Sequence, residues 1–118
     1  QYIDYSRYMD MNTALQVLAA LSQETRLEVF RQLVRAGPAG QAAGDISAKL
    51  AARQNTMSSH LKQLQAAGLV TRRRAGRHII YAANYERVTG LIRFLMEDCC
   101  AGAKEVRGAL NRALVRET

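Results

Sequence analysis

Apolar side chains recur every three to four positions through the first third of the chain, a spacing typical of helices packed on one face. The spacing predicts one helix over 12–21 and a second that ends near Arg35. Ser22 is a suitable N-cap for the second helix, and Glu24 lies in its expected first turn. The segment 36–44, AGPAGQAAG, contains the single proline of the chain and three glycines, so we expect a loop there.

Two closely spaced helices are predicted after this loop. Asp45 is expected to cap a short helix over 46–51. A turn at Ala52–Arg53 then leads to a longer helix over 54–67, and Gly68 is suited to close it at the C′ position.

The pattern then changes to that of strands and back to that of a helix. Residues 69–74 and 78–83 are two expected strands, and Gly76 between them can take the positive φ of a tight hairpin. A long helix is predicted from Glu86 to about Cys100. Four helices, a hairpin and a helix predict a mainly α protein with a β-hairpin wing, which is a winged helix-turn-helix.

The chain ends fall outside this pattern. The first ten residues are polar and tyrosine-rich, and they fit a leader, a cloning remnant or an arm on the domain. Residues 101–118 show a weaker helical pattern. The expected organisation is therefore an N-terminal arm over 1–11, one winged helix-turn-helix domain over 12–100 and a C-terminal tail over 101–118.

The composition limits the class of protein. The chain has 118 residues, 48% of them apolar, which is enough for one domain with a modest core. No apolar run approaches the roughly 18 residues that a membrane span needs, and no secretory signal is found, so we expect a cytoplasmic protein. A glycine-rich phosphate loop, a carboxylate pair beside a histidine and a nucleophile elbow are all missing, so we expect no enzymatic activity.

Positive charge is concentrated in one part of the sequence. The formal net charge is +7, and no carboxylate occurs between Asp45 and Glu86. The basic residues in this interval are Lys49, Arg53, Lys62, Arg72, Arg73, Arg74 and Arg77. Such clustering is typical of a surface that binds phosphates, so we expect double-stranded DNA as a partner. Solubility alone is the simpler explanation of a basic chain, but it does not predict the clustering.

The helix over 54–67 has an apolar and a polar face. At about 100° per residue, Met57, Leu61 and Leu64 share the core face. The opposite arc carries hydrogen-bonding side chains that can read base edges in a major groove, with an ordinary solvated face as the alternative. The candidates for DNA contact are Gln54, Asn55, Ser58, Ser59 and Lys62. His60 lies nearer the core face, and we expect it to be partly buried and hydrogen-bonded.

The arginines of the predicted hairpin cannot all point toward one duplex, because Arg72, Arg73 and Arg74 alternate between the two faces of a strand. Arg74 and Arg77 flank the turn and are the preferred wing-tip candidates, for contact with phosphates or with a minor groove. His78 begins the second strand and is either a DNA contact or plain strand surface.

The segments LSQETRLEVFRQL (21–33) and NTMSSHLKQLQAAGLVTRRRAGRHIIYA (55–82) resemble the ArsR/SmtB family of small winged-helix repressors. The resemblance extends over residues 12–100, and the run SxHLxxLxxAGLV is its most specific part. It implies a homodimer paired through the first and last helices, a palindromic operator, and an inducer that weakens DNA binding. Arg53 departs from the family, which often has a serine there to cap the reading helix.

The family senses metals at several alternative sites, and two of them are absent from this sequence. The segment AAGDISAKL has no cysteine for a Cys-x-Cys site, and the last helix has no histidine for a zinc site. The run EDCC (97–100) resembles the third type, a vicinal cysteine pair that binds trivalent arsenic. The resemblance therefore implies Cys99 and Cys100 as ligands, no required cofactor, and arsenite, methylarsenite or antimonite as inducer.

The chemistry of the cysteine pair leaves alternatives open. Cys99 continues an apolar stripe of the last helix, whereas Cys100 lies about 100° further round. One soft ion that bridges both sulfurs would need the helix to distort or end there, which Gly102 makes feasible. The alternatives are small hydrophobes packed in an interface and a repressor of the same fold that senses redox state or reactive sulfur. A winged-helix module that binds protein is a further alternative, which the acid-free interval disfavours.

Overall fold

Five helices and three strands occur in the part of the chain that the computed structural model describes, which is residues 9–50, 54–97, 108–109 and 111–113. In chain order they are α1 (Met11–Leu21), α2 (Glu24–Ala36), β1 (Gln41–Ala42), α3 (Ala43–Leu50), α4 (Gln54–Ala66), β2 (Val70–Ala75), β3 (His78–Ala83) and α5 (Tyr85–Glu97). This order confirms the predicted winged helix-turn-helix and adds one strand, β1. Two short helical pieces, 108–109 and 111–113, lie in the expected tail.

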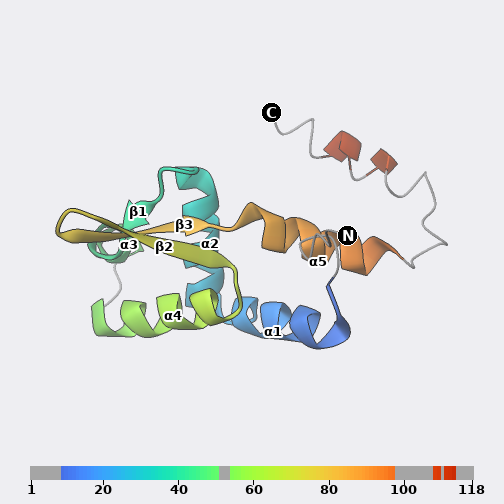
Figure 1. Ribbon diagram of the computed structural model, residues 1–118, viewed down its shortest axis with the longest axis horizontal. Helices are drawn as coiled ribbons and strands as arrows, with labels where there is room; N and C mark the ends of the chain where they lie inside the picture. Colours follow the sequence, from blue (N-terminus) through green and yellow to red (C-terminus); the bar gives the residue numbers. More distant parts are fainter. Residues whose placement is uncertain (1–8, 51–53, 98–107, 110, 114–118) are drawn as a thin grey trace, which may run out of the picture.

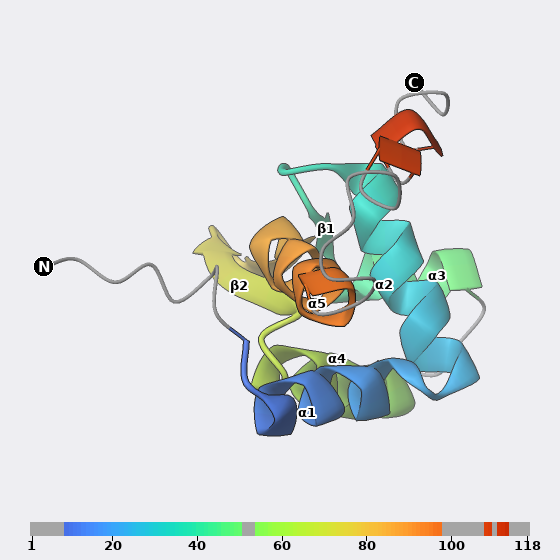
Figure 2. The same cartoon turned by 90° about the vertical axis from the view of Figure 1, so that its right-hand side faces the viewer.

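The helices and the hairpin divide the molecule into two ends. Figures 1 and 2 show α1 and α4 along the same side of the molecule, with α2 rising steeply from them. The β2–β3 hairpin extends over α4 toward one end of the molecule. Helix α5 lies toward the other end, where α1 also lies. The wing tip and α5 are therefore far apart, and α4 lies beneath the wing.

The sheet is antiparallel, with β3 in the centre and the strand order β1-β3-β2. Gln41 of β1 pairs with Tyr81, and Ala75 of β2 pairs with His78 across a two-residue turn. Gly76 in that turn has a φ of 63°, as the predicted tight hairpin requires. The loop predicted over 36–44 is wrong from Gln41 onward, where the structure has β1 and the start of α3. The sequence did not predict β1 because two residues are too few to show the alternation that marks a strand.

The boundary between α1 and α2 lies one residue from the predicted one. The side-chain oxygen of Gln23 accepts a hydrogen bond from the N–H of Arg26 over 2.8 Å and caps α2. Ser22 ends α1 instead, and its hydroxyl donates to the carbonyl of Ala19 over 3.0 Å. Ser22 as N-cap was therefore a wrong prediction, because the longer glutamine side chain makes the capping bond. Glu24 lies in the first turn, as expected.

Two aspartates show that a capping residue cannot be recognised by its type alone. Asp10 caps α1 by accepting a hydrogen bond from the N–H of Thr13 over 2.7 Å, and this bond lowers the pKa of Asp10. The predicted cap Asp45 is wrong, because α3 begins directly after β1 at Ala43 and Asp45 lies inside its first turn. Its negative charge still favours the helix there.

The end of α4 follows the prediction within one residue. The N–H of Gly68 donates to the carbonyl of Gln65 over 2.9 Å, and the N–H of Leu69 donates to that of Leu64 over 2.9 Å. These are the two hydrogen bonds of a Schellman motif with Gly68 at C′. These hydrogen bonds define the end of α4, the helix expected to read base edges, and the chain then enters β2.

The core lies between the helices and the sheet. Its largest fully buried side chains are Leu33, Ile46, Met57, Leu61, Leu64, Leu69, Val17 and Val29. They come from α1, α2, α3, α4 and the start of the wing, so one apolar cluster fixes all these elements together. Within the ranges that the structure describes, no helix has both the length and the apolar character to cross a membrane.

Candidate nucleic-acid interface

The polar face of α4 is turned outward because its opposite face is anchored in the core. Met57, Leu61 and Leu64 are fully buried, as their spacing predicts. The exposed side chains of the polar face include Ser58, Ser59 and Lys62. Hydroxyl and ammonium groups at these positions are free to meet base edges and phosphates. Their exposure agrees with the sequence, and their contact with DNA stays a prediction.

Several predicted site residues lie outside what the structure describes. Gln54 and Asn55 begin α4, but their side chains are not among the described ones. Arg53, Cys99 and Cys100 fall outside the described ranges altogether. Among the residues within those ranges, no group of three histidine, cysteine or acidic side chains could hold a metal ion. The cysteine site therefore stays a prediction.

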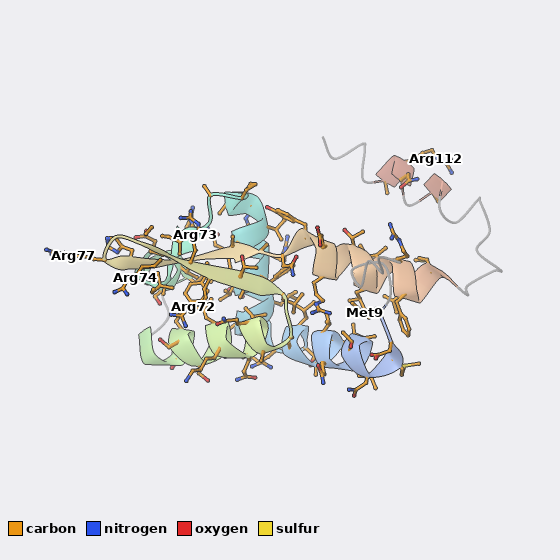
Figure 3. All side chains as sticks on the ribbon, viewed as in Figure 1. Met9, Arg72, Arg73, Arg74, Arg77 and Arg112 are labelled. Carbon is orange, nitrogen blue, oxygen red and sulfur yellow. The ribbon has the colours of Figure 1, made fainter. Side chains whose placement is uncertain are left out.

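The hairpin arginines divide between two faces, as their alternation predicts. Figure 3 shows Arg73 on the face of β2 away from α4, and its guanidinium donates to the carbonyl of Ala39 over 3.0 Å. Arg74 lies on the other face near the turn, with its Nε 3.4 Å from the carbonyl of Gly76. Arg77 extends from the wing tip. The two preferred wing-tip candidates are thus both exposed and both available to a ligand beside the hairpin.

Arg72 is a candidate that the sequence analysis did not select. It shares the face of Arg74, is exposed, and lies between the hairpin and α4 in Figure 3. The same strand alternation that separates Arg73 from Arg74 contained this signal, because residues two apart on a strand point the same way. Arg72 and Arg74 therefore form a basic row that faces the same side as α4.

The surface made by α4 and the hairpin carries no acidic side chain, because α4, β2 and β3 contain none. His78 is exposed at the start of β3. No ion pair within the described residues neutralises Arg72, Arg74, Arg77 or Lys62. This surface therefore attracts a polyanion without any carboxylate to repel its phosphates.

His60 is half-buried, as predicted, but the predicted hydrogen bond is not found at Nδ1 of its ring. Its Nδ1 is buried and has no hydrogen-bond partner among the described residues. Burial lowers the pKa of His60, and the positive charge of Arg26 lowers it further. The neutral ring is therefore favoured at neutral pH, so His60 does not add to the positive charge of the surface.

The start of α5 is joined directly to the end of α4. The side-chain amide of Asn84 donates to the carbonyl of Gly68 over 2.9 Å, and its backbone N–H donates to the carbonyl of Leu69 over 2.8 Å. The guanidinium of Arg87 lies so close to Gly68 that a Cβ at that position would collide with it. The turn that follows α4 and the start of α5 are therefore in direct contact.

Comparison with known sequences points to one kind of protein. A family model described as a helix-turn-helix domain matches residues 21–73. "Putative arsenical resistance operon repressor ArsR2" of Halobacterium salinarum is 41% identical over 66 residues, which are 56% of this chain and 55% of the relative. The chain thus spans about half the length of this curated relative.

Solved structures with the same fold extend the match over most of the chain. The ArsR-like transcriptional regulator from Rhodococcus sp. RHA1 has a TM-score of 0.65 and 30% identity, and the match covers 89% of each chain. HlyU from Vibrio cholerae N16961 has a TM-score of 0.61 and 28% identity, covering 78% of this chain and 99% of HlyU. The Halobacterium relative is named as a repressor and the Rhodococcus structure as a transcriptional regulator, so the comparisons place this chain among regulators of transcription rather than enzymes.

Proposed function

Because the chain belongs to the ArsR family of winged helix-turn-helix transcriptional regulators, we propose that it is a cytoplasmic repressor that binds a palindromic DNA operator. The observation that carries the proposal is the acid-free surface formed by α4 and the wing. The exposed serines and lysine of α4 suit a major groove, and the hairpin arginines suit the flanking backbone. In this proposal α4 and the hairpin contribute to the same DNA-binding surface.

Replacing Arg77 with alanine should weaken binding to every duplex by removing one contact to a phosphate. The slope of log K against log salt concentration should fall by about one unit. Binding is measured by fluorescence anisotropy, on a duplex that the protein enriches from a random pool and on random duplex. Arg31→Ala removes the same charge from an exposed position on α2 and serves as the control.

Replacing Ser58 or Gln54 with alanine should act on sequence preference instead. We expect a loss of roughly 1–3 kcal/mol at particular base pairs and little change on random duplex. An unchanged ratio between enriched and random duplex in both variants would show that this face of α4 does not read bases.

We further propose that the protein is a homodimer paired through α1 and α5, because both helices expose apolar side chains at the same end of the molecule. Met11, Leu15 and Leu18 of α1 are 63%, 57% and 42% exposed, and Leu95 of α5 is 50% exposed. Figure 2 shows the two helices near one another at that end. Apolar groups exposed together favour an interface, and a two-fold dimer would match a palindromic operator.

Sedimentation velocity at micromolar concentration should therefore give the mass of a dimer. Leu15→Glu should give a folded monomer, because the new charge would be buried in the interface. The matched exchange Gln65→Glu, at an exposed position of α4, should leave the dimer intact. A folded wild-type monomer would contradict the proposal.

The inducer in this proposal is a trivalent arsenical or antimonite bound by Cys99 and Cys100. Support comes from the arsenical resistance named for the Halobacterium relative and from the preference of thiolates for soft ions. The pair lies one residue beyond the end of α5 in the sequence. Ligand binding there would change the end of α5, and the link from Asn84 to Gly68 would pass a shift of α5 to α4.

A further inference from the structure

A shallow groove lies where α1, α2 and α4 meet, beside the C-terminal part of α4. Its volume is about 490 Å³. Its lining is Gln16, Ala19 and Ala20 of α1, Arg26 of α2, Gln63 and Ala66 of α4, and Ala67 just after α4. Four of these seven side chains are methyl groups, which leave space above the floor. The other three carry N–H donors, and no lining side chain is acidic.

The cation of the groove is held in place by the fold. The Nε of Arg26 donates to the carbonyl of Ala20 over 2.6 Å, which fixes the guanidinium at the end of α1. The terminal amino groups of Arg26 make no hydrogen bond within the described residues. Arg26 is also close enough to His60 to affect its pKa, which places the cation beside α4. A fixed guanidinium with free N–H groups is suited to bind a phosphate oxygen.

The groove is placed to meet DNA that is bound by α4. It adjoins the C-terminal part of α4, and α1 continues the same side of the molecule beyond it (Figures 1 and 2). The wing tip lies toward the other end of α4 (Figure 1). A duplex with α4 in its major groove presents a phosphate backbone on both sides of the helix. The wing can meet one of these backbones, and the groove lies near the end of α4 away from the wing tip, where it could meet the other.

We propose that the groove binds a backbone phosphate of the operator, with Arg26 as the cation and Gln16 and Gln63 as further donors. This site rests on the proposed DNA-binding function and extends it to a second row of phosphates, nearer to α1. The reading helix is then held between two phosphate contacts, one from Arg26 and one from the wing arginines. Such contacts set the register of the helix in the groove and carry no base preference.

The direct test is the salt dependence of DNA binding by Arg26→Gln, whose slope should fall by about one unit on every duplex. Because Arg26 also ties α1 to α2, this variant can lose stability, so Gln16 supplies a second test. Gln16→Lys adds a cation to the groove, and Gln16→Glu adds an anion. We expect the lysine variant to raise the slope by about 0.9 unit, a factor of about 3.5 in affinity between 50 and 200 mM salt. The glutamate variant should bind more weakly than wild type.

The matched controls are Ala39→Lys and Ala39→Glu. Ala39 is exposed and lies beside Arg73, on the side of the hairpin away from α4, so the same changes in net charge fall far from the groove. The proposal is supported if the Gln16 pair shifts the slope and the Ala39 pair does not. If the Gln16 and Ala39 variants change the salt slope equally while Arg77→Ala still lowers it, the groove site is overturned and the proposed function remains intact. Binding without any salt dependence would overturn both.

Discussion

Cys99→Ser and Cys100→Ser should each abolish the release of operator DNA by trivalent arsenicals while leaving DNA affinity unchanged. Each substitution removes one of only two thiols in the chain and leaves a hard oxygen that binds trivalent arsenic poorly. The surface made by α4 and the wing is untouched. Methylarsenite has one position filled by carbon and needs two thiolates, so it should be at least as effective as arsenite on wild type. Zinc should have little effect, because two thiolates do not complete a tetrahedral site.

The measurement is fluorescence anisotropy of labelled operator, titrated with arsenite, methylarsenite, antimonite and zinc. Thr89→Ser changes an exposed side chain of α5 and keeps both thiols, so it should respond as wild type does. Full release of both cysteine variants by arsenicals would remove the thiol pair from the mechanism. Release of wild type by peroxide or persulfide, with none by arsenicals, would favour the thiol-based redox or reactive-sulfur sensor.

Gly40→Ala should lower the free energy of unfolding by about 3 kcal/mol or more, the largest loss that we expect from adding a single methyl group. Gly40 has a φ of 72°, a conformation that costs residues with a Cβ roughly 1–2 kcal/mol. The added Cβ would also collide with the backbone carbonyl oxygen of Tyr81 and lie 2.9 Å from Cγ2 of Ile80. Both neighbours belong to β3, the central strand, and backbone cannot move aside as a side chain can.

Gly76→Ala is the matched control for this prediction. Gly76 has a similar φ of 63°, but a Cβ there would meet open space. Only the conformational cost applies, so we expect a loss of about 1 kcal/mol. Urea denaturation at one fixed protein concentration compares the two variants, because the stability of a dimer depends on concentration. Equal losses would show that β3 or the preceding turn moves to accept the methyl group.

The elements that the sequence predicted correctly depend on neighbours along the chain. The spacing of Met57, Leu61 and Leu64 predicted which face of α4 is buried, and Gly68 marked its end. The alternation of residues along β2 predicted that its arginines would separate between two faces. Each of these signals can be recognised from the spacing or the type of residues that are close in the sequence, so a local rule is sufficient.

The features that the sequence did not predict depend on partners far along the chain. Strand β1 exists because Gln41 meets Tyr81, forty positions later, and no local alternation precedes that contact. The groove needs the end of α1, Arg26 and the last turn of α4 in one place. The capping error at Ser22 is different, because two neighbouring residues could both cap α2 and only the backbone geometry selects Gln23. Contacts between residues far apart in the sequence could therefore be seen only in the structure.

The strand order has a consequence for the behaviour of the protein at high concentration. Strand β1 pairs with two positions on one edge of β3, and the whole of β2 pairs with the other edge. Among the strands that the structure describes, the outer side of β2 is therefore a long, unpaired edge of the sheet. The apolar sequence HIIYAA of β3 is of the kind that self-associates when another strand can reach it. Three successive arginines on β2 repel an identical edge and so oppose the growth of intermolecular sheets. The basic character of the wing therefore also protects the folded chain against aggregation, and a wing with fewer arginines would lose part of that protection.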